Sequence, residues 1–284
     1  MTYPTDRPAV WFVTGASRGL GLALVRHLLG RGDRVAATTR SSERLFAGLK
    51  DVDTANLLAL EVSLVDETHV SAAIAEATEK FGRIDVVVNN AGYGILGAVE
   101  KTSTDDIRTM FDVQLIGTWN VIRAVLPQMR AASSGHIINV SSIVGLIAFP
   151  GWGLYSAAKF AIEGLSESLA AEVAGFGIGV TVVEPGYFDT AFLTEESLVV
   201  TNDSSGAYPA IVEMIAAHKE MPGTQPGDPA KAAAAFVAIA QRESGPLHQQ
   251  LGSDSSGLAE GKSDSLRADV LAGRELAHST DYSR

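Results

Sequence analysis

The amino-acid sequence predicts an α/β protein with a doubly wound parallel sheet of about seven strands, flanked by helices and folded as a single domain. In the first two thirds of the chain, six short apolar runs alternate with stretches of helical period, the pattern of a parallel sheet covered on both faces. The chain has 284 residues, 46% of them hydrophobic, which is enough to bury one large core. Neither an internal repeat nor a linker interrupts it, so residues 1–284 are expected to form one domain.

Strands are expected where a short apolar run ends in a turn signal. These runs are residues 9–14, 34–40, 56–62, 83–92, 136–142 and 177–186, followed by a last strand at 247–251. Helices are expected at 22–32, 65–82, 102–133, 155–175, 209–220 and 228–241. Asp228 is the expected cap of the last of these helices, because Pro229 follows at its first position.

A glycine-rich turn, TGASRGLG at 14–21, joins the first strand to the first helix, with the spacing G-x-x-x-G-x-G. Small residues let the backbone approach a pyrophosphate, and the following helix directs its free N–H groups at it. The turn therefore predicts a dinucleotide site, although a simple tight turn is the alternative. The residues assigned to the cofactor here are Gly15, Ser17, Arg18, Gly19, Leu20 and Gly21.

The end of the second strand indicates which dinucleotide binds. An acidic residue there would bind a ribose 2′-hydroxyl, whereas an arginine would accept a 2′-phosphate. This chain has Thr38, Thr39 and Arg40 with no acid, and Arg18 is a second cation nearby. The sequence therefore favours NADP(H) over NAD(H), unless Arg40 is only a solvated surface charge.

Other polar and small residues also stand at the carboxyl ends of predicted strands, where ligands of doubly wound sheets bind. The residues that converge on this edge are Gly15, Arg40, Asn89, Ser142 and Pro185. Glu61 and Val62 would lie beside the adenine, and Asn89 would hold neighbouring strands together. Ala91 and Gly92 leave room for a flat ligand. The convergence predicts a single site.

Tyr155 and Lys159 are four residues apart and would leave the same face of a helix. A phenol ordinarily has a pKa near 10, and a cation held beside it brings that pKa down toward working pH. Such a pair suits a general acid or base. By itself the spacing equally describes a surface Tyr and Lys; the neighbouring dinucleotide turn and Ser142 favour the chemical role.

Composition excludes several other classes of protein. The formal net charge of −11 argues against binding to nucleic acid or to an anionic membrane surface. There is no cysteine, and no histidines stand at metal-ligand spacing, so no metal site is expected. Neither a signal peptide nor an apolar run long enough to span a membrane is apparent, and a cytoplasmic location is predicted.

The chain changes character after the sixth strand. Residues 187–228 combine aromatic side chains, a polar stretch and a short helix, and are expected to form a loop and helix that cover the substrate. Residues 252–284 form a Gly/Ser-rich, charged tail with a helix expected only around 266–276.

Taken together, these motifs resemble the short-chain dehydrogenase/reductase family, whose fold is a Rossmann-like sheet. The resemblance runs from about Val10 to Thr190 and continues weakly to Gly252. It is carried by TGASRGLG (14–21), NNAG (89–92), Ser142, Tyr155-x-x-x-Lys159 and PGYFDT (185–190), in the family's order and spacing. A weaker similarity points to the branch that includes hydroxysteroid and retinol dehydrogenases.

The resemblance implies a mechanism in which hydride passes between nicotinamide C4 and a carbonyl carbon. Tyr155 would exchange the proton of the carbonyl oxygen, and Ser142 would orient that oxygen. Lys159 would lower the pKa of Tyr155 and hold the nicotinamide ribose. The resemblance also gives cofactor contacts to Asn89, at the cofactor-side turn, and to Pro185, Gly186 and Thr190, beside the nicotinamide.

Two positions depart from the family pattern. The long fourth helix usually has Asn where this chain has Gln114, in FDVQLIG, and in the family that Asn holds a water that relays protons to the lysine. Gln114 is therefore assigned to the catalytic set, with either a rebuilt relay or reduced activity expected. Glu61 stands where Asp is usual.

The leading hypothesis is an NADP(H)-dependent oxidoreductase of ketones or secondary alcohols. Apolar residues expected near the site favour a mostly apolar substrate; they are Ile95, Phe149, Trp152, Phe188 and Phe192. The alternatives are a non-catalytic NADP(H)-binding or scaffold protein, which Gln114 would permit, and dehydration or epimerisation. By resemblance, a homodimer or homotetramer would form through the helices that contain Gln114 and Tyr155.

Overall fold

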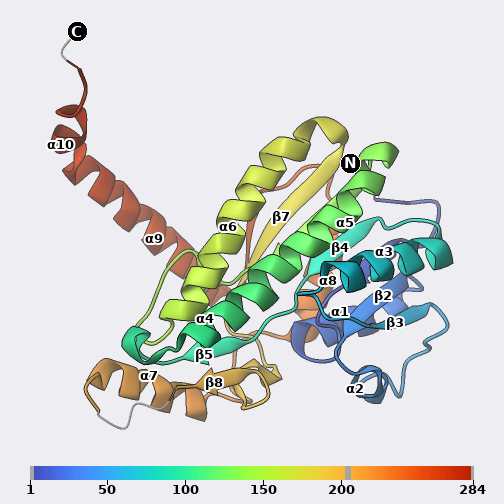
Figure 1. The fold of residues 1–284 in the computed structure, drawn as a ribbon, viewed down its shortest axis with the longest axis horizontal. Helices are drawn as coiled ribbons and strands as arrows, with labels where there is room; N and C mark the ends of the chain where they lie inside the picture. Colours follow the sequence, from blue (N-terminus) through green and yellow to red (C-terminus); the bar gives the residue numbers. More distant parts are fainter. Residues whose placement is uncertain (1–2, 202–205, 283–284) are drawn as a thin grey trace.

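The computed structural model describes residues 3–201 and 206–282. Its centre is a seven-stranded sheet of order β3-β2-β1-β4-β6-β7-β9, in which all neighbouring strands are parallel (Figure 1). The strands are β1 (Val10–Val13), β2 (Arg34–Thr39), β3 (Leu57–Glu61), β4 (Val86–Asn89), β6 (Gly135–Val140), β7 (Ile178–Pro185) and β9 (His248–Leu251). The predicted single-domain, doubly wound sheet is confirmed, although every strand is shorter than its predicted run.

Helices cover both faces of the sheet, and β1 shows why its sequence is apolar throughout. Trp11 packs with Leu24 and Phe236 of the helices behind the sheet, whereas Phe12 packs with Val121 of the helices in front. The helices behind are α1 (Gly19–Gly30) and α8 (Pro229–Gln241), and those in front include α3 (Glu67–Phe81), α5 (Gly117–Ala132) and α6 (Gly153–Val173) (Figure 1). None of the helices in the described part of the chain is both long and apolar enough to cross a membrane.

The helix predicted at 102–133 is present, but its middle is not α-helical. Helix α4 (Thr104–Phe111) leads into a π-helical turn at Asp112–Ile116, from which α5 continues. Ser103 caps α4 through a capping box with Asp106, as the sequence of its first turn suggests. The π-helical turn contains Gln114. Its wider i→i+5 hydrogen bonding is not apparent from the spacing of apolar residues in the sequence.

Three short elements escaped the sequence analysis. Helix α2 (Ser42–Ala47) follows β2, and a two-stranded parallel sheet joins β5 (Gly94–Leu96) to β8 (Leu198–Val200). Strand β8 and α7 (Pro209–Glu220) belong to the predicted covering segment 187–228, of which residues 202–205 lie outside the described part. Strands β5 and β8 have three residues each, too few to show an alternating apolar pattern. They are strands because they pair with each other.

The C-terminal tail is more helical than predicted. Helix α9 runs from Ser253 to Ala272 and is followed by α10 (Arg274–His278), so the expectation of a helix only around 266–276 placed its start too late. The first turn is fixed by the sheet, because the Ser255 hydroxyl donates to the carbonyl oxygen of Glu184 over 2.7 Å. Beyond that anchor α9 projects away from the rest of the molecule (Figure 1).

Candidate active site

Tyr155 and Lys159 lie one turn apart on α6, facing the sheet, and only 7% and 4% of their surfaces are exposed. The Lys159 ammonium lies 5.5 Å from the centre of the Tyr155 ring. Its Nζ donates to the carbonyl oxygen of Val140 over 2.9 Å, at the end of β6. Ser142 follows two residues later, close enough to the Tyr155 hydroxyl to lower its pKa. The structure thus brings the three predicted catalytic side chains together.

Burial dominates the acid–base properties of this group. It raises the pKa of Tyr155, and the Ser142 side chain opposes that rise. Burial also lowers the pKa of Lys159 to about 8, against an opposing effect of Glu163. The lowered pKa expected at the phenol is therefore not seen: Ser142 opposes the rise only in part, and the Lys159 ammonium lies against the ring and donates to Val140.

Aromatic side chains cover the Tyr155 phenol. The rings of Trp152 and Phe192 each lie 5.5 Å from that of Tyr155, centre to centre. Trp152 in turn packs on His218 of α7 at 5.2 Å, and His218 Nε2 pairs with the Tyr187 hydroxyl at 2.9 Å. The segment 187–228 therefore lies directly over the tyrosine.

The glycine turn is compact because it packs against the turn after β4. Gly15 has φ +66°, and a Cβ there would stand 2.7 Å from Cα of Ala91. The Asn90 amide donates to the carbonyl oxygens of Thr14 and Gly15, at 2.9 and 3.2 Å. Helix α1 then begins with neither a side-chain cap nor an acidic residue in its first turn. Its free N–H groups suit an anion such as a pyrophosphate.

Asn89 and Asn90 therefore have different partners. The Asn89 amide donates to Asn139 Oδ1 over 2.8 Å, and the Asn139 amide donates to the Ser166 hydroxyl over 2.9 Å, so this buried row ties β4 to β6 and α6. The strand-holding role foreseen for Asn89 matches this contact, whereas the cofactor-side turn is held by Asn90. The sequence analysis missed Asn90 and Thr14; the alternation of side chains at a strand end was the only available signal.

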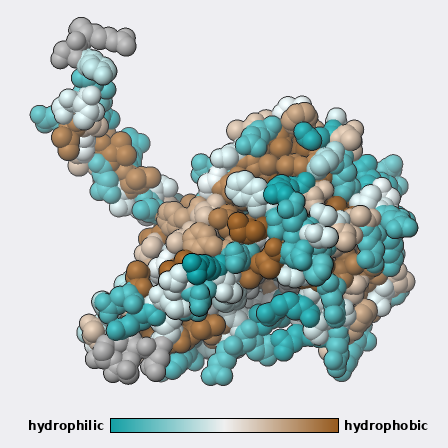
Figure 2. Space-filling model, in the orientation of Figure 1, coloured by the Kyte–Doolittle hydropathy of each residue, from teal (hydrophilic) through white to brown (hydrophobic). Residues whose placement is uncertain are grey.

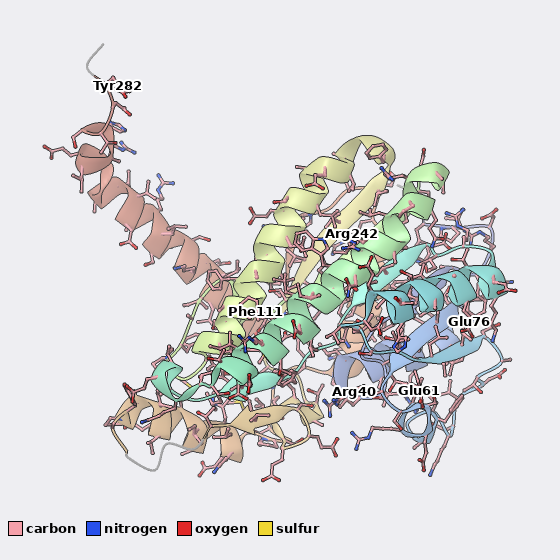
Figure 3. The ribbon with its side chains drawn as sticks, in the orientation of Figure 1. Arg40, Glu61, Glu76, Phe111, Arg242 and Tyr282 are labelled. Atoms are coloured by element: carbon pink, nitrogen blue, oxygen red, sulfur yellow. The ribbon has the colours of Figure 1, made fainter. Side chains whose placement is uncertain are left out.

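Three arginines gather beyond β2, where a 2′-phosphate was predicted. Burial, followed by the charges of Arg40 and Arg44, lowers the pKa of Arg18. Arg18 donates to the carbonyl oxygen of Glu196 over 2.5 Å, and Arg44 pairs with the Glu196 carboxylate at 3.4 Å. Arg40 is exposed at this edge of the sheet (Figure 3). Arg44 and Glu196 were not foreseen, because they are far apart in the sequence.

Glu61 lies at the neighbouring strand end (Figure 3), and both Glu61 and Val62 already have partners there. Glu61 Oε1 accepts from the Ser42 N–H of α2 over 2.8 Å, which holds the pKa of Glu61 below its ordinary value. The Val62 N–H donates to the carbonyl oxygen of Thr39 over 3.0 Å. The N–H group of Val62 is therefore already bonded within the sheet.

The end of β7 comes close to the glycine turn. A Cβ on Gly19 would lie 3.8 Å from Cβ of Thr190, so the predicted nicotinamide side and the pyrophosphate side of the site adjoin. Pro185 is the last residue of β7, and Gly186 follows without room for a side chain, because Asp254 of α9 occupies that space. The Asp254 carboxylate also accepts from the Tyr187 N–H over 2.8 Å.

Gln114 is buried in the π-helical turn, with 1% of its surface exposed. Its amide donates to the carbonyl oxygen of Tyr93 over 2.9 Å and contacts Met110 Sδ. Its Oε1 has no hydrogen-bond partner among the described residues and lies 3.1 Å from where a Cβ on Gly92 would be. A buried carbonyl oxygen ordinarily accepts a hydrogen bond from a protein group or from water.

Comparison with known proteins agrees with this arrangement. Residues 9–198 match the family model described as short chain dehydrogenase. An oxidoreductase of Botryotinia fuckeliana (strain B05.10), BOA17, is 38% identical over 269 residues, which cover 94% of this chain and 97% of the relative. The chain belongs to the short-chain dehydrogenase/reductase family and is an oxidoreductase of that family.

Two solved structures show the same fold. A short-chain dehydrogenase from Streptomyces avermitilis is 36% identical and superposes with a TM-score of 0.87, over 98% of this chain and 100% of that one. The protein ElxO with NADP bound is 28% identical, with a TM-score of 0.71 over 86% and 97% of the two chains. A nicotinamide cofactor is typical of the family, and the glycine turn and uncapped α1 described above fit one.

Proposed function

We propose that the protein is an NADP(H)-dependent reductase of ketones, or dehydrogenase of the corresponding secondary alcohols, with a mostly apolar substrate. The observation that carries this proposal is the group of Ser142, Tyr155 and Lys159 at the sheet edge that also holds the glycine turn. A proton-transfer tyrosine beside a dinucleotide turn is the arrangement that carbonyl reduction requires.

The side chains divide the chemistry among them. The nicotinamide, when bound, supplies or accepts the hydride. In reduction Tyr155 donates its hydroxyl proton to the carbonyl oxygen, and in oxidation it accepts the proton of the alcohol. Ser142 orients that oxygen by a hydrogen bond and stabilises the phenolate. Lys159 contributes a positive charge that favours the phenolate and, by family resemblance, holds the ribose; Gln114 completes the hydrogen bonding behind it.

The preference for NADP(H) is supported by the arginine cluster. Arg18, Arg40 and Arg44 form a cationic group beyond β2, and no acidic residue ends that strand. A guanidinium group binds a phosphate in a bidentate manner, which suits a 2′-phosphate. The NADP-bound relative ElxO agrees with this assignment. We also propose cofactor contacts for the residues at the other strand ends, namely Glu61, Val62, Asn89, Ala91, Gly92, Pro185, Gly186 and Thr190.

An apolar substrate is supported by the residues packed around the tyrosine. Ile95, Trp152, Phe149 and Phe192 belong to the same apolar cluster as Tyr155. Phe188 is different, because its ring lies against Gly227. We propose that the segment 187–228 opens to admit the substrate and closes over it, which excludes water from the reaction.

The replacement Tyr155→Phe tests the assignment. It removes the proton donor and keeps the ring that packs against Trp152 and Phe192, so we expect turnover to fall at least about a hundredfold while NADPH still binds. The measurement is NADPH oxidation across steroids, aryl ketones and acyl ketones, with NADPH fluorescence for binding. Retained turnover in the variant would refute the role of Tyr155. Tight NADPH binding without turnover by the unmodified protein would instead indicate a cofactor-binding scaffold.

A further inference from the structure

A second group of ionisable side chains lies on the far side of Lys159. Glu163 follows Lys159 by one turn of α6, and it meets Glu184 of β7 and His248 of β9. Glu163 and Glu184 are buried, with 5% and 0% of their surfaces exposed. Glu167, one further turn along α6, is exposed. The active-site lysine is thus linked to the surface by a row of charged groups on one helix face.

Glu163 is held less firmly than the other members of this group, although Ser141, Glu184 and His248 all lie near its carboxyl group. His248 Nδ1 donates to Glu184 Oε1 over 2.8 Å, and the Gln250 amide donates to the other oxygen of Glu184. His248 Nε2 lies 3.5 Å from the Glu167 carboxylate. Both carboxyl oxygens of Glu163 are buried without a geometrically good hydrogen bond, although His248 Nδ1 is 3.3 Å from one of them. Because the dielectric constant of the protein interior is low, a buried carboxyl group in this position interacts strongly with the charged groups around it.

We propose that Glu163 is a positioning residue for Lys159, whose carboxylate holds the lysine in its charged form in the buried site. The inference rests on the proposed function, because it concerns the lysine that favours the phenolate of Tyr155. Glu163 lies one turn beyond Lys159 on α6, and we assign it an effect through its charge alone.

The ionisation of both groups supports this role. Burial raises the pKa of Glu163 to about 7, and Glu184 adds to the rise, while Ser141 and His248 oppose it. Burial lowers the pKa of Lys159 to about 8, and the charge of Glu163 opposes that lowering. The two groups act on each other, because an ionised Glu163 favours the charged form of Lys159. The negative charge of Glu163 thus favours the ammonium at the pH where burial would otherwise neutralise it.

A divalent metal ion is a less favourable occupant. Glu163, Glu184 and His248 do each offer one ligand atom within 4.8 Å of the others. Both oxygens of Glu184 already accept hydrogen bonds, however, and the neighbouring Lys159 ammonium would repel a cation. The cationic form of His248 is also favoured, because against the opposing effect of burial Glu184, Glu163 and Glu167 together raise its pKa.

The test is a titration of Lys159 by NMR in the intact chain, with lysine labelled at Cε and the signal assigned by its loss in Lys159→Met. We expect Glu163→Gln to lower the titration midpoint of Lys159 by about one pH unit, because it removes a nearby opposite charge. Glu163→Asp should retain most of the wild-type midpoint. Glu172→Gln is the matched control, since it makes the same change at an exposed position of α6 and should leave the midpoint unchanged.

His248→Gln provides a second variant at a partly exposed position, in case Glu163→Gln fails to fold. Loss of this cation keeps Glu163 protonated to higher pH, so the Lys159 midpoint should fall in the same direction by less. The proposal would be overturned if the midpoint were unchanged in both folded variants. It would also be overturned if the purified protein contained stoichiometric zinc that Glu163→Gln releases.

If the protein reduces ketones, the alkaline limb of the pH profile of kcat/KM should shift with the Lys159 midpoint. A shifted midpoint without turnover would refute the proposed function and leave the inference intact.

Discussion

Asn89 and Asn90 are neighbours in the sequence and belong to different parts of the molecule. Asn89 joins Asn139 in the buried row that ties β4 to β6, whereas Asn90 ties the turn after β4 to the glycine turn. One substitution should therefore affect stability and the other should affect cofactor binding.

We expect Asn89→Ala to lower the free energy of unfolding by about 1–3 kcal/mol, because it leaves the buried Asn139 Oδ1 without its donor. NADPH affinity should change little. Asn90→Ala, in contrast, should weaken NADPH binding more than it weakens the fold. Urea unfolding and NADPH fluorescence titration measure the two quantities. A larger loss of NADPH affinity in Asn89→Ala than in Asn90→Ala would return the cofactor role to Asn89.

For single residues, the sequence predicts where a side chain lies on its helix or strand better than it predicts which groups that side chain contacts. The i, i+4 spacing of Tyr155 and Lys159 placed both on one helix face, as the structure has them. It did not reveal that the Lys159 ammonium lies against the phenol ring and donates to Val140, since this depends on the distance between β6 and α6. Arg44 and Glu196 meet across about 150 residues, and no local pattern encodes such a pair.

Among the elements, the buried parallel strands were predicted because burial on both faces requires continuous apolar runs. Strands β5 and β8 were missed because three residues have no period of their own. The early start of α9 was missed because its first turn is fixed by Glu184 and Tyr187, on another element. The sequence therefore predicts elements that would form from their own pattern, and fails for those that a distant contact creates.

Strand β6 contains a buried histidine that should make stability depend on pH. Burial lowers the pKa of His136 to about 4 in the folded protein, against about 6.5 when unfolded, and its Nε2 pairs with the Thr181 hydroxyl at 2.9 Å. The unfolded chain therefore binds the additional proton between pH 6.5 and 4. The contribution of His136 to stability is complete above pH 6.5 and is lost as pH falls toward 4, by about 3 kcal/mol at most.

The variant His136→Gln tests this, because glutamine keeps a polar group and does not titrate. Urea unfolding at pH 7 and at pH 4.5 should show a smaller loss of stability in His136→Gln than in the wild type. The exposed His278 provides a control, since His278→Gln makes the same substitution outside the sheet. Equal losses in wild type and His136→Gln would show that carboxyl groups alone cause acid destabilisation.

At the scale of the whole molecule, the front helices expose apolar side chains that a single chain does not cover. Ile116, Trp119 and Phe160 are between 42% and 46% exposed, and Figure 2 shows apolar surface over α5 and α6. These are the helices of Gln114 and Tyr155, through which a homodimer or homotetramer was expected. We propose that two chains pair across this face, because burying such side chains is favourable.

Light scattering coupled to gel filtration tests the pairing. The double variant Trp119→Glu/Phe160→Glu puts charges into the proposed interface, so we expect it to run as a monomer where the wild type runs as a dimer or tetramer. Phe176→Glu is the control, because Phe176 is equally exposed, at 43%, and lies beyond the end of α6. A double variant with the wild-type mass would exclude this face.

The position of Glu196 should affect the rate of cofactor exchange. Its carboxylate in the covering segment pairs with Arg44, and its carbonyl oxygen pairs with Arg18, in the cationic group assigned to the 2′-phosphate. These contacts tie the covering segment to the cationic group. Salt screens exposed charges, so high ionic strength should loosen the segment and speed NADPH release. Stopped-flow release rates should rise with salt in the wild type and depend on it less in Glu196→Gln. If the salt dependence is the same in both proteins, the charge of Glu196 does not hold the covering segment closed. The rate of NADPH release would then be independent of this charge.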